Sequence, residues 1–196
     1  VDTLMLSSVS DQAVGAVGTA NTYIGVFIIM FGVISSGMVA VMTQNIGAGK
    51  PGIAYQARQL GLLFNAIIGV LMSVFLAFFS GNILKIVSIA PALLEPAETY
   101  LKIVGGACFL NALIPIFSSY LRVFGYTKQS LFASVVGNVI NFVLNAVFLY
   151  VMNLGVMGVA AATVISRVIN LIIVAVMGAV LILSLIHISE PTRQAE

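Results

Sequence analysis

Charged residues are scarce in this chain of 196 residues. Lys, Arg, Asp and Glu together make up 7% of it, against about a quarter in soluble domains. Long stretches hold no charge at all, namely residues 12–49, 59–84, 103–121 and 129–166. Each is long enough for a helix of roughly 20 residues that crosses a bilayer. The scarcity excludes a soluble core and predicts an all-α, polytopic membrane protein.

Other residue types are scarce too. The single cysteine, Cys108, excludes a disulfide framework and a thiolate metal site within one chain. The net charge of +2 comes without a basic cluster and stacking aromatics, so nucleic acid is not an expected partner. Outside the last 13 residues there is no histidine, and no two acids share a spanning segment. Neither an enzyme nor a resident cofactor or metal is therefore expected.

Glycine, proline and polar clusters divide the chain into helices. Gly47 to Gly52 contains a strong stop signal, and Pro115 predicts a kink inside a helix. The link from Ile83 to Glu98 is expected at the membrane interface. The first helix resembles the end of one whose beginning is missing. The predicted helices lie at about 1–10, 13–45, 53–80, 97–124, 129–152 and 156–183.

The few basic residues predict the orientation. The connections after the second and fourth helices hold four basic residues and no acid: Lys50, Arg58, Arg122 and Lys128. Those on the other side hold two lysines beside three acids. Because cytoplasmic loops carry the excess of Lys and Arg, the first set is expected in the cytoplasm. The protein is expected in the inner, or plasma, membrane of a prokaryote.

A stripe of amides is the strongest internal pattern. Asn138, Asn141 and Asn145 are three and four residues apart, which places them on one helix face. Thr163 and Arg167 share a face of the next helix. Amides in hydrocarbon are costly without partners, so these faces point toward protein or a watery pathway. The alternative is ordinary packing, in which asparagines supply interhelical hydrogen bonds worth about 0.6–2 kcal/mol each.

Four further side chains have competing interpretations. Asp2 is an acid in a spanning segment, where burial disfavours the charged form and lets a carboxyl group exchange protons. Alternatively it is a solvated acid at a chain end. Thr163 could bond to its own helix. Arg167 could pair with Asp2 or with amide oxygens, or snorkel to the interface. Gln44 is a candidate helix cap or gate contact on the pathway.

The last stretch, 184–196 (SLIHISEPTRQAE), differs in character from the rest. It is similar to translated sequencing-adapter read-through, so we predict that it is a non-native tail. The alternative is a native polar segment after the sixth helix. His187, the one histidine of the chain, lies in this stretch and is assigned no role.

Several motifs occur together and in order: VDTLMLSSVSDQAVGAVGTAN, TQNIGAGKPGIAYQARQLG, LLEPAETYLKIVG, RVFGYTKQSLFASVVGNVINFVLN and GVMGVAAATVIS. Together they resemble the N-terminal lobe of the multidrug and toxic compound extrusion (MATE) transporters. The resemblance covers residues 1–183. It implies a fold of two six-helix lobes with alternating access, of which this chain is a fragment, one lobe with a partial first helix. The C-terminal lobe would be a missing part of the same chain.

The resemblance also implies a site. One branch of the family has a cation site in this lobe, built from an acid on helix one, two polar residues on helix five and a threonine on helix six. These positions match Asp2, Asn141, Asn145 and Thr163. The second helix-five position is often an aspartate, and here it is Asn145. With one carboxylate in place of two, proton binding is favoured over sodium binding.

The function expected from this resemblance is secondary active transport. The whole protein would be an antiporter that exports organic or cationic drugs and toxins through the bilayer, in exchange for a proton or a sodium ion. The alternative is a flippase for lipid-linked oligosaccharides from the same wider superfamily. Such a flippase tends to carry further basic residues in its cavity, whereas Arg167 is the only basic residue deep in a span. An intramembrane enzyme is disfavoured.

Overall fold

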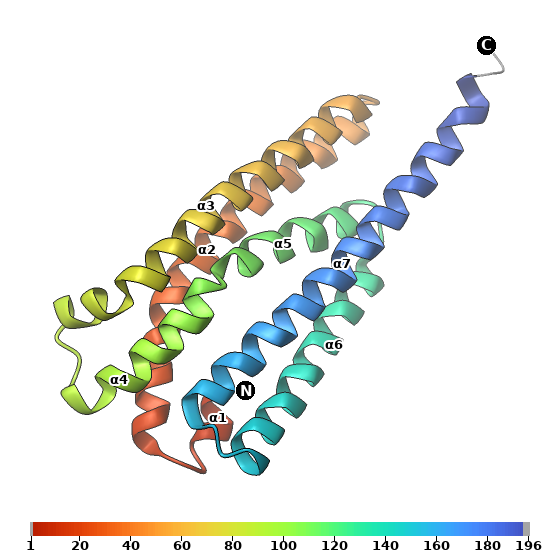
Figure 1. Cartoon of the computed structure of the whole chain (residues 1–196). Helices are drawn as coiled ribbons and strands as arrows, with labels where there is room; N and C mark the ends of the chain where they lie inside the picture. The colour runs from red at the N-terminus through yellow and green to blue at the C-terminus, as the bar shows by residue number, and fades with distance from the viewer. Residues whose placement is uncertain (1, 194–196) are drawn as a thin grey trace.

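Helices joined by short connections make up the described part of the chain in the computed structural model. The structure describes residues 2–193, with side chains as far as residue 181. No strand occurs among these residues, which confirms the all-α class. Figure 1 shows an elongated bundle of helices. The elements are α1 (Asp2–Leu6), α2 (Asp11–Gly47), α3 (Pro51–Ile86), α4 (Pro91–Tyr100), the π-helical turn η1 (Leu101–Gly105), α5 (Cys108–Val123), α6 (Thr127–Ala146), the π-helical turn η2 (Val147–Val151) and α7 (Gly155–Arg193).

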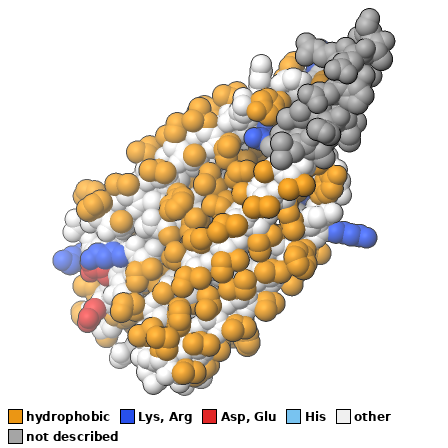
Figure 2. Space-filling view, turned by 45° about the vertical axis from the view of Figure 1, so that its right-hand side comes forward, with side chains coloured by type: hydrophobic (Ala, Val, Ile, Leu, Met, Phe, Trp, Pro, Cys, Tyr) orange, Lys and Arg blue, Asp and Glu red, His pale blue; other side chains and the backbone are white. Residues whose placement is uncertain are grey.

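Five of these segments are long and apolar enough to span a bilayer. Within the described residues, four continuous helical segments pass on length and hydropathy: α2, α3, α6 with η2, and α7. The fifth is a broken span, in which α4 with η1 meets α5 at an angle of 44°. Hydrophobic side chains cover most of the face in Figure 2. Phe78 is 78% exposed, for example, which suits contact with lipid. The chain is a multi-pass membrane protein.

Local signals explain most helix ends. The Ser10 side chain accepts a hydrogen bond of 3.3 Å from the backbone of Ala13 and so caps α2. The chain leaves α2 through Gly49, whose φ of 70° suits glycine. Pro51 is the first residue of α3, where its missing N–H costs nothing. The predicted stop between the second and third helices is confirmed.

The third helix is longer than predicted. It continues from Ser80 through Gly81 and ends at Ile86, so the interfacial link shortens to residues 87–90. A Cβ atom on Gly81 would lie 2.8 Å from Glu98 Oε1. This glycine allows a close approach to α4 and does not end the helix. The next helix accordingly begins at Pro91, and the first helix ends at Leu6, before the predicted residue 10.

The break in the fourth span lies at residues 106–107 and not at Pro115. Helix α5 runs through Pro115 without interruption. At the break, the backbone N–H of Phe109 donates a hydrogen bond of 2.8 Å to Ser73 Oγ on α3. A side chain from a neighbouring helix therefore caps the start of α5. It supplies an acceptor for a backbone N–H that the break leaves without one inside the helix.

Close packing joins α3 to the broken span. A Cβ on Gly69 would lie 2.7 Å from Ala112 Cβ, and one on Gly105 would lie 2.9 Å from Leu76 Cβ. Asn65, fully buried, donates to the carbonyl oxygen of Ala112 at 2.9 Å. Small residues and a buried amide are the usual means of tight helix packing in membranes. These contacts hold α3 against α5 and η1.

The last helix also exceeds its prediction. Helix α7 extends to Arg193, beyond the predicted end at residue 183, because 184–190 contain neither glycine nor proline. The side chains of the predicted tail, His187 included, lie outside the described residues. The non-native origin of 184–196 stays a prediction.

Candidate functional site

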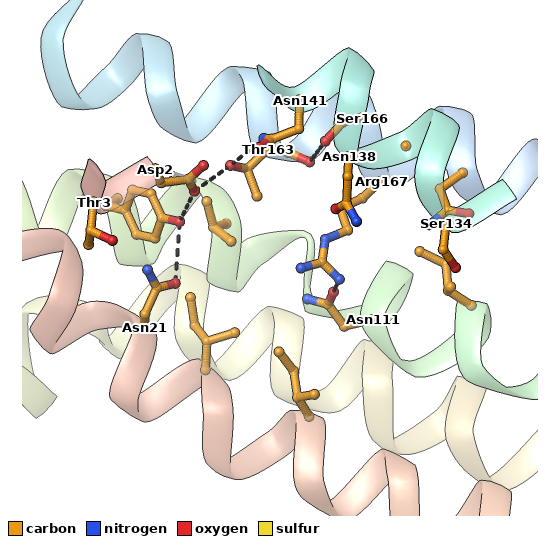
Figure 3. Close-up of a pocket in the computed structure, with 17 residues that line it drawn as sticks. Asp2, Thr3, Asn21, Asn111, Ser134, Asn138, Asn141, Thr163, Ser166 and Arg167 are labelled. Carbon is orange, nitrogen blue, oxygen red and sulfur yellow. Dashed lines mark hydrogen bonds between the residues drawn. The ribbon is translucent and has the colours of Figure 1, made fainter. Parts of the chain in front are cut away.

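The carboxylate of Asp2 accepts hydrogen bonds from three other helical segments. Tyr100 Oη at the end of α4 donates to Oδ2 at 2.9 Å, and Thr163 Oγ1 on α7 donates to the same oxygen at 2.8 Å. Asn145 Nδ2 on α6 donates to Oδ1 at 2.8 Å. Figure 3 shows Asp2 and Thr163 directed at each other. One short helix, α1, thus brings its acid to the point where three longer segments meet.

The predicted site residues lie in one network. Asn145 Nδ2 also donates to Asn141 Oδ1, and Asn141 Nδ2 donates to Thr163 Oγ1, both at 3.3 Å. Since Thr163 and Asn145 both contact Asp2, the four side chains form a closed ring of hydrogen bonds. The structure brings together Asp2, Asn141, Asn145 and Thr163; their role in binding a cation stays a prediction.

Two hydroxyl groups at the site have a choice of acceptor. Thr163 Oγ1 lies 3.0 Å from the carbonyl oxygen of Val159 as well as close to Asp2. Tyr100 Oη lies 3.3 Å from Asn21 Oδ1, in addition to its contact with Asp2. Each hydroxyl has a single hydrogen. Both can therefore turn away from Asp2 without losing a hydrogen-bond acceptor.

Asn145 is the most enclosed member of the network. Its side chain is fully buried, and both hydrogens of its amide have acceptors, Asp2 and Asn141. Its Oδ1 atom is buried and has no hydrogen-bond partner. A buried acceptor left unsatisfied costs about 1–3 kcal/mol. The Asn145 Oδ1 atom is therefore a free hydrogen-bond acceptor in the residue that contacts the Asp2 carboxylate.

Irregular helix geometry accompanies two of the donors. Tyr100 is the last residue of α4, directly before the π-helical turn η1. Asn145 lies two residues before the π-helical turn η2. Such turns shift the register of the following residues and are frequent at functional sites. Here each turn lies directly after the segment that directs a donor at Asp2.

The network forms one end of a cavity of about 470 Å³. Its polar wall comes from α1, α6 and α7, and Figure 3 shows these side chains around the same space. Part of the opposite wall is apolar. The polar residues that matter here are Asp2, Asn138, Asn141, Thr163, Ser166 and Arg167, and the apolar ones are Ile24, Ile28, Val104 and Ile114. A space lined by polar side chains and by a group of aliphatic ones suits an amphipathic organic molecule.

The remaining candidates differ in position. Asn138 is exposed and lines the cavity. Arg167 also lines it and donates to Asn111 Oδ1, so of the interpretations left open the amide partner is the one observed. Gln44 is exposed at the end of α2 and is not part of the cavity wall. A role for Gln44 in a gate remains a prediction.

Sequence reasoning missed three site residues. Tyr100 gives no signal, because it looks like any aromatic near a membrane interface. Asn21 and Asn111 lie inside charge-free runs, so the argument that picked out the amides of α6 applies to them as well. Both line the cavity.

Known proteins are similar to this chain in sequence and in fold. The sequence profile of the MatE family matches residues 1–147. The chain belongs to the MatE family. The uncharacterized transporter YisQ of Bacillus subtilis is 35% identical over 175 residues, which are 87% of this chain and 38% of that protein. Multidrug resistance protein PmpM of Pseudomonas aeruginosa is 29% identical over 152 residues, 76% of this chain and 31% of that protein.

The fold comparison agrees with this membership. The inward-facing structure of a multidrug resistance MATE family transporter of the MOP superfamily superimposes with a TM-score of 0.81 at 23% identity. The match covers 89% of this chain and 40% of that one. This MatE chain thus spans about a third to two fifths of the length of these three proteins. The resemblance read from its motifs is confirmed.

Proposed function

We propose that the protein containing this MatE chain is a proton-coupled secondary transporter that exports organic solutes across the plasma membrane. The observation that carries the proposal is the Asp2 carboxylate, held by donors from α4, α6 and α7 at the edge of the cavity. A single acid bonded to several helices can transmit its protonation state to all of them. Membership of a transporter family supports this class of function over an enzyme.

Protonation of Asp2 would rearrange its hydrogen bonds. A neutral carboxyl group accepts weaker hydrogen bonds than a carboxylate and has a hydrogen of its own to donate. The hydroxyls of Tyr100 and Thr163 can then turn to Asn21 and Val159. Rotation of the Asn145 amide would present its unused Oδ1 to the new hydrogen on Asp2. The first two changes would loosen α1 from α4 and from α7, while Asp2 stays bonded to Asn145 of α6, and this would bias the bundle between two conformations.

Asn145 is the reason for choosing the proton as the coupling ion. Sodium prefers several oxygen ligands with negative charge, and Asn145 directs a nitrogen at Asp2. Both oxygens of Asp2 already accept hydrogen bonds. A sodium ion would have to displace these donors, whereas a proton requires only their rotation. Sodium remains the alternative coupling ion that the experiment below distinguishes.

The exported solutes are proposed to be drugs and toxins, since PmpM is named a multidrug resistance protein. The small organic solute would cross between this chain and a second lobe of the same protein. A lipid-linked oligosaccharide flippase is the runner-up. Arg167 is the only basic residue among those that line the cavity, which gives a pyrophosphate little to bind. The proposal therefore stays with organic solutes.

The test uses the intact transporter in proteoliposomes loaded with ethidium or with fluorescein. An imposed proton gradient is expected to drive uphill movement of at least one dye, and a sodium gradient alone is expected to drive neither. Protein-free liposomes are the control for leakage. Movement driven by sodium alone, or no movement above the leak under a proton gradient, contradicts the proposal.

A further inference from the structure

Arg167 is a charged side chain that has no carboxylate in direct contact among the described residues. It is half-buried in the cavity wall, and its guanidinium donates to the neutral amide oxygen of Asn111. In the described part of the chain no carboxylate oxygen lies within 4.0 Å of it, and the ion pair found there joins Lys102 to Glu98 at 2.7 Å. A guanidinium has five N–H donors, so one amide oxygen leaves most of them for other acceptors.

A neighbouring helix holds the Arg167 guanidinium in position. Asn111 on α5 is buried and accepts a hydrogen bond from the guanidinium through its Oδ1 atom. Figure 3 shows the Arg167 guanidinium directed at Asn111. The charge is thus presented to the cavity by a defined support.

The cavity wall has one acid and one base. Among the described residues that line it, Asp2 is the one acid and Arg167 the one base. Asp2 is already satisfied by Tyr100, Asn145 and Thr163. Arg167 has a neutral hydrogen-bond partner, and the Asp2 charge acts on it only through space, so an added anion gains more at Arg167 than an added cation gains at Asp2. Apolar side chains opposite, Ile24, Ile28, Val104 and Ile114, suit the hydrocarbon part of a solute.

We propose that Arg167 anchors an oxyanion of the solute, so that this lobe takes organic anions with an apolar body and a carboxylate, sulfonate or phosphate group. That the bound anion is also exported rests on the proposed function, whereas binding of the anion requires only the cavity. Asn111 acts as a positioning residue, since it would reach the solute only through Arg167.

The test measures binding to the purified chain in lipid nanodiscs. Three fluorescent probes share one ring system and differ in charge: 2-naphthoate, 2-naphthylmethanol and 2-naphthylmethylammonium. The chain has no tryptophan, so naphthalene anisotropy is read against a low background. Naphthoate is expected to bind about tenfold or more tightly than the alcohol, because a charge-assisted hydrogen bond is worth that much.

Three variants separate the anion site from general damage. Arg167→Gln is expected to weaken naphthoate binding about tenfold or more and to leave the alcohol unchanged. Asn111→Asp keeps the guanidinium but supplies an internal carboxylate, and it is expected to weaken naphthoate binding to a similar extent. Arg122→Gln is the matched control. It removes a guanidinium at the end of α5, outside this cavity, and is expected to change nothing.

The outcomes are distinct. Loss of naphthoate binding in both cavity variants, with alcohol binding retained, supports the anion site even if the intact transporter moves no dye on a proton gradient. Equal binding of naphthoate in the parent chain and in Arg167→Gln overturns the site and leaves the export proposal standing. Tighter binding of the ammonium probe than of naphthoate, or no measurable naphthoate binding, also overturns it.

Discussion

Asn145 donates a hydrogen bond of 2.8 Å to Asp2, across 143 residues of sequence. The bond joins the fully buried amide of α6 to the first residue of α1. Where the family resemblance leads us to expect a second carboxylate, this chain directs a hydrogen-bond donor at the first one. The charge of the site therefore depends on Asp2 alone.

Replacing Asn145 with aspartate should create a sodium site. Two carboxylates in contact repel each other, and a bound cation relieves the repulsion. Sodium binding to the folded state should raise the melting temperature of Asn145→Asp by about 2–4 °C in sodium chloride relative to choline chloride. Thermal unfolding of the purified protein at mildly alkaline pH measures it. The unaltered chain should respond equally to both salts.

Asn138→Asp is the control for that experiment. It makes the same chemical change on the same helix and in the same cavity wall, but Asn138 has no described bond to Asp2. Sodium should not stabilise it specifically. An equal sodium effect in both variants, or none in Asn145→Asp, would contradict the proposed position of the site.

Tyr100→Phe should destabilise the fold while it keeps the packing of the ring. Tyr100 is 1% exposed, and its hydroxyl donates to Asp2 at 2.9 Å. Loss of this donor to a carboxylate should lower the free energy of unfolding by about 1.5–3 kcal/mol. Chemical unfolding in detergent measures it. Tyr126→Phe alters a tyrosine that is 39% exposed and should be nearly neutral; equal effects would mean that the bond to Asp2 contributes nothing.

Gly69→Ala should loosen α3 from α5. The added methyl group would lie 2.7 Å from Ala112 Cβ and 3.1 Å from Phe109 Cα, so backbone has to move. Overpacking of this kind costs about 1–3 kcal/mol. Heating followed by size-exclusion chromatography compares it with Gly18→Ala, where no atom lies within 4 Å of the added carbon. Gly18→Ala should be as stable as the parent, and equal losses in the two variants would contradict the packing described here.

The sequence predicts the class, the spans and much of the site, for physical reasons. Charge-free runs indicate spanning helices, and amides three and four residues apart share a face in any α-helix. The spacing of Asn141 and Asn145 is therefore enough to put both on one helix face, where they bond to each other. Asp2 and Thr163 joined them through the family resemblance, which the geometry now matches with direct hydrogen bonds.

What sequence reasoning missed depends on contacts between distant residues. The break at residues 106–107 rests on Ser73 of α3, whereas Pro115, the local signal, lies in an uninterrupted helix. Gly81 resembles a stop but allows the approach of Glu98. Tyr100 becomes a site residue only because Asp2, 98 residues away, lies beside it. None of these pairings has a local pattern.

The variant Asp2→Asn tests most directly whether Asp2 couples solute export to proton movement. In proteoliposomes of the intact transporter, solute counterflow requires the moving helices but no net proton movement, whereas uphill export requires the proton. Asp2→Asn should retain counterflow and lose the acceleration by a proton gradient. Asp11→Asn, which removes an exposed acid at the start of α2, should keep both. Undiminished gradient-driven export in Asp2→Asn would contradict the role of Asp2 as the coupling carboxylate.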